Sequence, residues 1–416
     1  MSAATTTGGA LAVGSVPGAR PGPGELTQTL TDLASAAIGA TVVHADDELF
    51  ADRRHLIDPR PSQWQPGYGR DGKIYDGWET RRRRLKPGED PASACDTAIV
   101  RLGAPGVVRH VVVDTAHFKG NYPATASVEG LSVEGYPSPE ELREATWTTL
   151  VPRSPLKGDT ANGFDVDSPR RWTHVRLTIY PDGGVARLRV LGEVVPDPRL
   201  VVGTVDLLAL QLAGQVVGCS NMFFSSPANL IRPGAHATIA EGWETARRRD
   251  GGNDWVLFRL GLAGAPRLLE IDTSLYTGNA PGEARLRGID ARVSSLDDEA
   301  AWVDLLPRTR LQPDTLHRFR LCDHQPGGAW GPSVTHARLD VYPDGGVGRV
   351  RLFGEVDAAA RTELGRRWLA TLPVGHLREV LGLVPGLSAA DAERVGGGSP
   401  AALQDLPPAL VDYLAG

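Results

Sequence analysis

The chain has 416 residues, of which 41% are hydrophobic and 23% are charged; this balance is typical of a globular protein and excludes a fibrous or largely disordered one. The formal net charge of −6 at pH 7 argues against nucleic acid or an anionic membrane as the main partner, because both attract basic surfaces. The 49 glycines and 32 prolines favour turn-rich β structure. We therefore expect an all-β fold class and a small-molecule ligand.

The N-terminal residues 1–24 contain neither the early basic residues nor the apolar run of a secretion signal. They are predicted to form a disordered leader. No stretch of the sequence reaches the 18 or more apolar residues of a membrane span. Cys95, Cys219 and Cys322 lie far apart, without the CxxC spacing of a zinc or redox site. We interpret them as free thiols of a cytoplasmic protein, and we predict no metal and no cofactor.

The sequence contains an internal duplication. THVRLTIYPDGGVARLRVLGEV at 173–194 returns as THARLDVYPDGGVGRVRLFGEV at 335–356, which is 162 residues later. We therefore predict two homologous domains, a first repeat at 25–200 and a second repeat at 205–357. Shorter segments return in the same order at nearly the same offset: GWETRRRR from Gly77 and GWETARRR from Gly242, VVVDTAHFKGN from Val111 and LEIDTSLYTGN from Leu269, and ADDELFADRRHLI from Ala45 and CSNMFFSSPANLI from Cys219.

Hydrophobic alternation predicts antiparallel strands in each repeat. In residues 173–180, the apolar Val175, Leu177 and Ile179 alternate with polar residues, as in a strand with one buried face. Pro, Asp and Gly at 181–184 are turn residues, so we expect a hairpin to the apolar segment that follows. Each repeat is therefore predicted to be an antiparallel β-sandwich.

The last segment, residues 361–416, changes character. Leucines recur at helix-like spacing in WLATLPVGHLREVLGLVPGL and in PALVDYLAG, which predicts a small helical tail. LVPGLSAADAERV is faintly similar to a helix-hairpin-helix motif. Five Arg against six Asp and Glu in this segment are not the basic balance that a phosphate backbone requires. We interpret the tail as a packing or assembly element.

Two polar residues occur only in the first repeat. His117 and Lys119 lie in DTAHFKGN, where the second repeat has Leu275 and Thr277. Loops at strand ends often carry function, and an imidazole can exchange a proton near pH 7. We predict that His117 is an acid–base catalyst and that Lys119, one of only four lysines, binds a substrate carboxylate or carbonyl. The alternatives are a structural loop histidine and a solvated lysine.

Other candidates are shared by the two repeats. Glu79 and Asp114 are predicted to assist catalysis, although an Asp–Thr pair at a strand end is often a turn or cap. An Asp-x-x-His metal pair is less favoured, since no further ligand lies at suitable spacing. The residues predicted to bind substrate are Asn121, His174, Arg176, Tyr180 and Arg81. The structural alternatives for these residues are cross-strand ion pairs and contacts with internal carboxylates.

Three long segments point to a family. IYDGWETRRRR from Ile74, VVVDTAHFKGN from Val111 and RWTHVRLTIYPDGGVARLRVLGEV from Arg171 resemble allantoicase, and the resemblance covers about residues 45–357 in both repeats. It implies two tandem jelly-roll β-sandwiches of the galactose-binding-like kind. It also implies hydrolysis of allantoate to ureidoglycolate and urea in allantoin catabolism. Arg or Lys would then fix the carboxylate, while His117 or a nearby carboxylate would move protons.

Two other functions fit the same expected fold. One is a tandem carbohydrate-binding module, because jelly rolls often bind sugars and a fold does not determine function. Such modules usually expose aromatic rings, whereas we interpret Trp78, Trp147 and their repeats Trp243 and Trp302 as core anchors. The other is an inactive paralogue that serves as a scaffold. In all of these readings sheet edges or the tail would support a homo-oligomer.

Overall fold

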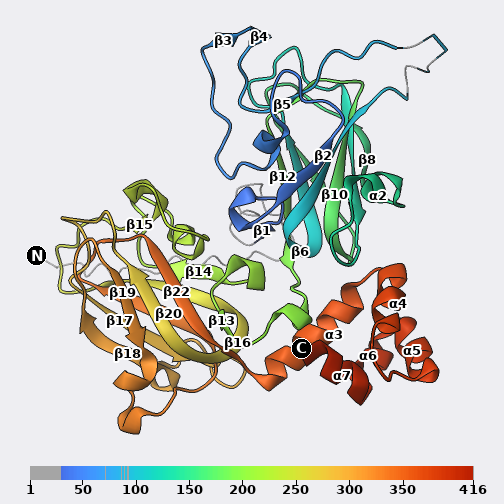
Figure 1. Cartoon of the computed structure of the whole chain (residues 1–416). Helices are drawn as coiled ribbons and strands as arrows, with labels where there is room; N and C mark the ends of the chain where they lie inside the picture. Colours follow the sequence, from blue (N-terminus) through green and yellow to red (C-terminus); the bar gives the residue numbers. More distant parts are fainter. Residues whose placement is uncertain (1–29, 71, 86, 89, 91–92, 416) are drawn as a thin grey trace, which may run out of the picture. The chain divides into compact units, whose positions relative to one another are not determined.

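The computed structural model describes residues 30–70, 72–85, 87–88, 90 and 93–415. The predicted leader at 1–24 lies outside these residues. The described chain divides into two compact units. One contains the first repeat and the C-terminal helices, and the other contains 206–208 and 214–355. In Figure 1 the first repeat runs from blue to green, the second from green to orange, and the C-terminal helices are red.

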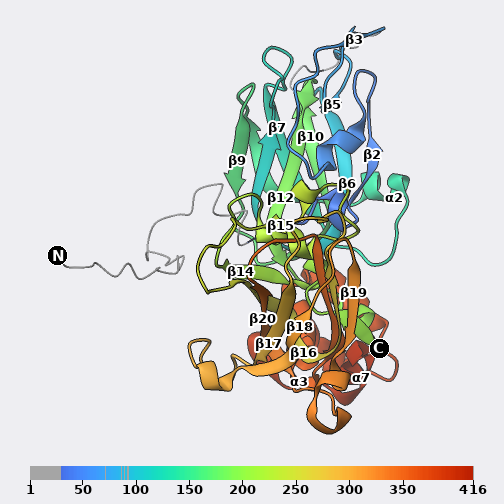
Figure 2. The same ribbon diagram turned by 90° about the vertical axis from the view of Figure 1, so that its left-hand side faces the viewer.

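A single long strand, β6 (Asp96–Asp114), organises the first repeat. Its first half pairs with β2 and β10, and its second half pairs with β9 and β12, all antiparallel. β6 therefore belongs to both layers of a sandwich. Figure 2 labels β6 and its partners β2, β9, β10 and β12 in this repeat. The other strands of these layers are β1 (Thr31–Asp32), β2 (Thr41–Ala45), β7 (Thr125–Leu131), β8 (Thr148–Pro155), β9 (Ala161–Asp165), β10 (Arg171–Tyr180) and β12 (Arg187–Val194).

Glycines let the middle of β6 approach its neighbours closely. A Cβ added at Gly106 would lie 2.3 Å from the carbonyl oxygen of Glu193, and one at Gly103 would lie 2.6 Å from the backbone nitrogen of Ala40. Side chains cannot occupy such positions without moving the backbone. The glycines of LGAPG, in the centre of the strand, are therefore required for close packing and do not form a turn.

Apolar side chains from both layers form the core of the first repeat. Trp78, Val100, Leu177 and Leu188 are completely buried, and burying side chains of this size contributes about 1.5–3 kcal/mol each. The expected core position of Trp78 and Trp243 is confirmed. The same expectation is wrong for Trp147 and Trp302. These two side chains are only half-buried, and their rings stack against the guanidinium groups of arginines instead.

The hairpin predicted across residues 181–184 is wrong. β10 and β12 do not pair with each other, since each pairs with a different half of β6. Between them β11 (Gly184–Val185) pairs with β5 (Trp78–Glu79). The turn residues thus carry the chain from one layer to the other. This is possible because β6 is long enough to pair with both strands.

The second repeat has the same topology around β16 (Asp254–Asp272). The first half of β16 pairs with β14 and β20, and the second half pairs with β19. The predicted all-β class with two tandem sandwiches is confirmed. The other strands are β13 (Thr204–Asp206), β14 (Gln215–Cys219), β15 (Trp243–Glu244), β17 (Glu283–Ile289), β18 (Val303–Arg310), β19 (Leu316–Arg320), β20 (Val334–Tyr342), β21 (Gly346–Val347) and β22 (Arg349–Val356).

Short helices connect the strands of both repeats. Among its described residues the first repeat contains one α-helix, α2 (Pro139–Glu144), whose first turn is closed by a capping box from Ser138 and Glu141. The 3-10 helices are η1 (Ala36–Ile38), η2 (Arg53–Ile57), η3 (Pro198–Leu200), η4 (Leu210–Leu212), η5 (Pro227–Ile231), η6 (Ile239–Glu241), η7 (Glu299–Ala301), η8 (Leu321–His324) and η9 (Pro326–Gly328).

The predicted helical tail is confirmed, and it begins slightly earlier than expected, at Ala358. Trp368 and Leu410 are completely buried in a cluster that also includes Val107 and Val195 of the first repeat. The tail therefore packs on the first repeat. No helix in the described ranges is long and apolar enough to cross a membrane. The tail helices are α3 (Ala358–Thr371), α4 (Val374–Gly382), α5 (Ala389–Gly396), α6 (Pro400–Gln404) and α7 (Pro408–Ala415).

A polar cluster also joins the tail to the first repeat. The buried His376 of α4 contacts Ser132 Oγ through Nδ1 at 2.7 Å and the Glu134 carboxylate through Nε2 at 2.6 Å. Arg199 donates to the same carboxylate at 2.9 Å and to Tyr413 Oη of α7 at 2.9 Å. The bond from His376, assisted by Arg199, holds the pKa of Glu134 at about 2, although burial acts in the opposite direction.

This depressed pKa predicts an acid-sensitive contribution to stability. The contribution is complete above about pH 4.5 and is lost as the pH falls towards 2, because the folded state must then protonate Glu134. We expect the loss to be about 2 kcal/mol, since Glu134 is partly exposed. Thermal unfolding followed between pH 6 and 2 measures it. Glu134→Gln should lose stability at pH 6 and show a flatter pH dependence; an unchanged pH dependence would contradict this assignment.

Candidate active site

A cavity of about 260 Å³ lies in the first repeat. Its wall comes from η2, from the segment 58–76 that follows it, and from the first residue of β12. Most of the lining side chains are polar or charged, which suits a small polar ligand better than an apolar one. These side chains are His55, Asp58, Arg60, Gln63, Gln65, Tyr75, Asp76 and Arg187.

The wall of this cavity is specific to the first repeat. Nineteen residues, 58–76, separate Ile57 from Gly77, whereas ten residues, 232–241, separate the matching positions of the second repeat. Part of the longer segment forms the small hairpin of β3 (Tyr68–Gly69) and β4 (Gly72–Lys73), labelled in Figure 1. Lys73 fastens this segment, because its Nζ lies 3.3 Å from the centre of the Trp64 ring and donates to the Gln65 carbonyl oxygen.

Arg187 is the structural centre of the wall. Its side chain is 2% exposed. Nη2 donates to both carboxylate oxygens of Asp76 at 2.8 and 2.9 Å, Nη1 donates to the carbonyl oxygens of Asp76 and Ala186, and Nε donates to that of Arg60. These bonds use all five N–H donors of a guanidinium. Arg187 therefore holds the wall together and has no donor left for a ligand.

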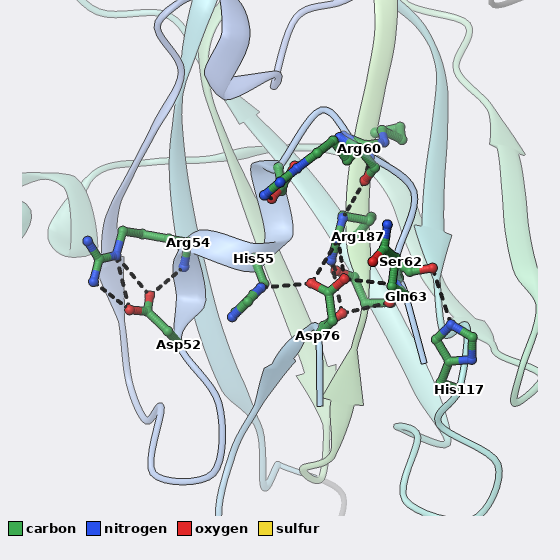
Figure 3. Close-up of polar contacts among 12 residues, drawn as sticks. Asp52, Arg54, His55, Arg60, Ser62, Gln63, Asp76, His117 and Arg187 are labelled. Atoms are coloured by element: carbon green, nitrogen blue, oxygen red, sulfur yellow. Dashed lines mark hydrogen bonds and ion pairs between the residues drawn. The ribbon is translucent and has the colours of Figure 1, made fainter. Parts of the chain in front are cut away.

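Asp76 connects Arg187 to a histidine. His55 Nδ1 lies 2.9 Å from Asp76 Oδ1, and the Gln63 backbone N–H donates to Asp76 Oδ2 at 2.8 Å, as Figure 3 shows. Burial alone would raise the pKa of Asp76, but the Gln63 N–H, Arg187 and His55 outweigh burial and lower it. Asp76 is therefore a carboxylate at neutral pH.

The second repeat has a different set of residues at the matching positions. Asn229 replaces His55 and donates to the Gly242 carbonyl oxygen from a buried position. Glu241 replaces Asp76, and its carboxylate accepts from the Ala237 backbone N–H at the surface. Arg349 replaces Arg187 and donates to carbonyl oxygens, including that of Glu241. The arrangement of histidine, carboxylate and arginine thus belongs to the first repeat.

The predicted catalysts His117 and Asp114 are not among the residues that line the cavity. His117 Nε2 donates to the Ser62 carbonyl oxygen at 3.2 Å (Figure 3), and its ring meets Trp64 edge-on. Its backbone has a φ of 70°, which Leu275 shares. Asp114 lies opposite Arg187 in the β6–β12 pairing. The pKa of Asp114 is raised, because the effect of burial outweighs that of the Ala116 N–H and of the nearby positive charges.

Glu79 and Asn121 form a hydrogen bond next to the cavity. Asn121 Nδ2 donates to Glu79 Oε1 at 2.7 Å, and Asn121 also bonds the cavity-lining Tyr75. Burial raises the pKa of Glu79, and the Asn121 bond only partly offsets this. Asn279 and Glu244 make the same bond in the second repeat, which favours a structural role in positioning the loop.

Two other predicted ligands lie at the surface. The side chain of Lys119 is 76% exposed, and its Nζ lies 3.7 Å from Asp159 Oδ2. Arg81 is bound to the Asp47 carboxylate through Nε, and its backbone N–H donates to the same group. Neither residue lines the cavity. In the described part of the chain no group of three or more His, Cys, Asp or Glu could hold a metal ion.

The three candidates on β10 also lie outside the cavity lining. His174 is buried and contacts Thr173 Oγ1; burial and the charge of Arg101 lower its pKa to about 4. Arg176 donates to Glu129 at 2.7 Å, and the Tyr180 ring lies 3.9 Å from the Arg153 guanidinium. The second repeat has matching contacts at His336 and Tyr342. These repeated contacts favour the structural alternatives.

Sequence reasoning missed the residues that line the cavity. Arg60 and Asp76 lie in the segment where the two repeats differ in length, and His55 lies just before it, so comparison of the repeats by shared motifs passed over them. One signal was present: ADDELFADRRHLI and CSNMFFSSPANLI align His55 with Asn229. This alignment marks a second histidine that only the first repeat has.

The bonding of Arg187 predicts a large effect on stability. Arg187→Met would leave the Asp76 carboxylate buried and without its cation, which costs about 3–5 kcal/mol. Arg349→Met is the matched control, because it removes bonds to carbonyl oxygens and is expected to cost about 1–3 kcal/mol. Denaturant unfolding of both variants and the wild type measures the difference. Equal losses would contradict the assigned role of the ion pair.

Comparisons with known proteins agree with this architecture. The allantoicase repeat, as a sequence family, matches residues 31–195 and 205–357. A protein of Streptomyces coelicolor named "Probable allantoicase" is 52% identical over 79% of this chain and 87% of its own length. "Probable allantoicase 2" of Burkholderia pseudomallei is 39% identical, over 81% of this chain and 98% of its own.

A solved structure is similar as well. The crystal structure of allantoicase from Saccharomyces cerevisiae has a TM-score of 0.63 and 29% sequence identity, and the match covers 79% of this chain and 94% of that one. The sequence matches include both repeats and leave most of the C-terminal tail outside. The chain belongs to the allantoicase family.

Proposed function

We propose that the chain hydrolyses allantoate to ureidoglycolate and urea, as an enzyme of allantoin catabolism, and that the cavity of the first repeat is its active site. Family membership supports the reaction. The observation that supports the location is the polar cavity lined by His55, Asp76 and Arg187, because the second repeat has Asn229 in place of the histidine and does not form the ion pair between the carboxylate and the arginine. A tandem carbohydrate-binding module is the alternative function.

The chemistry of allantoate suits the lining of the cavity. The substrate is a carboxylate whose tetrahedral carbon bears two ureido groups, so it needs one cation and several hydrogen-bonding partners. Arg60 supplies the cation: its guanidinium contacts Asp58 and is 77% exposed, whereas the guanidinium of Arg187 is fully used. The side chains of Gln63, Gln65 and Tyr75 can donate to or accept from the ureido groups.

The predicted catalysts His117, Asp114 and Glu79 enter this proposal as residues that position the wall. His117 holds the Ser62 carbonyl group, and the next residue, Gln63, lines the cavity. Asp114 faces Arg187 across the strand pairing. Lys119, Asn121, Arg176, His174 and Tyr180 remain predictions for substrate binding that the lining of this cavity does not support. Arg81 also remains a prediction; it lines a separate pocket of the first repeat together with Asp47 and Asp96.

Two further expectations belong to the proposal. We propose a cytoplasmic location, supported by three free cysteines. We also propose self-association, for which exposed apolar residues such as Phe223 and Phe224 of the second repeat offer a surface.

The direct test is a product assay in which purified protein is given allantoate and urea and ammonia are measured separately. Urea and ureidoglycolate are expected. Ammonia would indicate a different hydrolysis, and neither product from a folded sample would favour the binding module.

Filling the cavity tests the location of the site. Gln65→Trp should lower kcat/KM at least tenfold, because the larger ring takes up space that the substrate needs. Arg70→Trp, in the same long segment between η2 and β5 and outside the cavity lining, is the control and should remain close to the wild type. Equal kcat/KM values for the two variants would argue against this cavity as the active site.

His117→Leu tests the predicted catalyst with the residue that the second repeat carries in the same backbone conformation. Because His117 acts through Ser62, we expect kcat/KM to fall less than the roughly 100-fold that loss of a proton-transfer group causes. The pH–rate profile should keep its shape. A larger loss with an altered profile would return His117 to the role of acid–base catalyst.

A further inference from the structure

We propose that His55 is the acid–base catalyst of the first-repeat cavity and that Asp76 is the residue that positions it. This inference rests on the proposed function, because it assigns the proton transfers of that reaction. The observation behind it is the contact between His55 Nδ1 and Asp76 Oδ1 at 2.9 Å in the cavity wall.

The geometry leaves one ring nitrogen of His55 available. Because Asp76 is a carboxylate, Nδ1 carries the proton and donates, so Nε2 of the neutral ring has the free lone pair. Nε2 makes no hydrogen bond within the part of the chain that the structure describes, and Figure 3 shows it pointing away from Asp76. The ring itself lines the cavity and is 37% exposed, so a ligand can reach it.

His117 does not offer the same chemistry. Its Nε2 donates to a backbone carbonyl oxygen, and its ring lies outside the lining of the cavity. The two histidines therefore have different roles: His117 contacts the Ser62 carbonyl group (Figure 3), whereas His55 lines the cavity.

Asp76 is itself held in position from two sides. Arg187 Nη2 contacts both of its oxygens, and the Gln63 backbone N–H fixes the second one. A carboxylate with these three hydrogen bonds cannot rotate freely, so it orients the imidazole. The charged groups around His55 are Asp76 and Arg187 in the wall, Asp58 and Arg60 beside the cavity, and Asp52 at the start of η2.

One histidine can serve both halves of the reaction. In the protonated state of His55, Nε2 carries a second ring proton and donates it to a ureido nitrogen while the bond from that nitrogen to the central carbon breaks. The electron pair of the bond goes to the nitrogen, urea leaves, and the lone pair of the other ureido nitrogen stabilises the carbon. The oxygen of water then bonds to the carbon, and Nε2 accepts the proton that water releases. The proton given to urea equals the proton taken from water, so His55 returns to its starting state and no other reactant is needed.

The test replaces His55 with the residue of the second repeat. His55→Asn should lower kcat by about 10²–10⁴-fold with KM changed much less, and it should remove one limb of the pH–rate profile. Asp76→Asn should lower kcat and shift the remaining profile, which a purely structural role would not do. His44→Asn is the matched control, because His44 contacts Asp46 at 3.0 Å outside the cavity lining; its kcat should remain at the wild-type value.

Folding is checked by circular dichroism and the thermal midpoint. If His55→Asn unfolds, His55→Gln and imidazole rescue of His55→Ala provide the same test, and added imidazole should restore kcat at least tenfold. A folded His55→Asn with kcat within threefold of the wild type and an unchanged profile would overturn the assignment of His55 alone. A wild type that releases no urea from allantoate would overturn the proposed function, and the assignment with it.

Discussion

The buried ion pair between Arg187 and Asp76 is the interaction on which the first repeat's cavity depends. It ties the long segment after η2 to the start of β12, and through Asp76 it also orients His55. Removing Asp76 would leave the guanidinium of Arg187, which is 2% exposed, without its counter-charge, which is strongly destabilising.

The duplication explains how such a site can belong to one repeat only. Both repeats need the same long central strand, the same buried tryptophan and the same Asn–Glu bond, because these hold a sandwich together. Only one of them needs a cavity. In the second repeat the shorter segment places His236 in a buried position, where its Nε2 donates to the Ser274 carbonyl oxygen. The same framework is thus used for a site in one repeat and for packing in the other.

Sequence reasoning predicted the fold better than the site. Strand alternation, turn residues and the 162-residue offset were sufficient for two sandwiches and a helical tail, since all three depend on local patterns. The hairpin at 181–184 failed because strand pairing across β6 is not local. For the site, motif conservation between the repeats selected structural residues such as Arg176, which is bound to Glu129. Asp76 was missed because it lies in the segment where the repeats differ in length, and His55 was missed because the second repeat has Asn229 in its place.

A crystal structure of the protein with bound ureidoglycolate tests the central claim most directly, since it locates the active site without reference to any variant. The account predicts the product in the first-repeat cavity, with its carboxylate at Arg60 and its hydroxyl oxygen within hydrogen-bonding distance of His55 Nε2. Product bound in the second repeat, or bound in the first repeat around Arg176 and Tyr180 on β10, would contradict it.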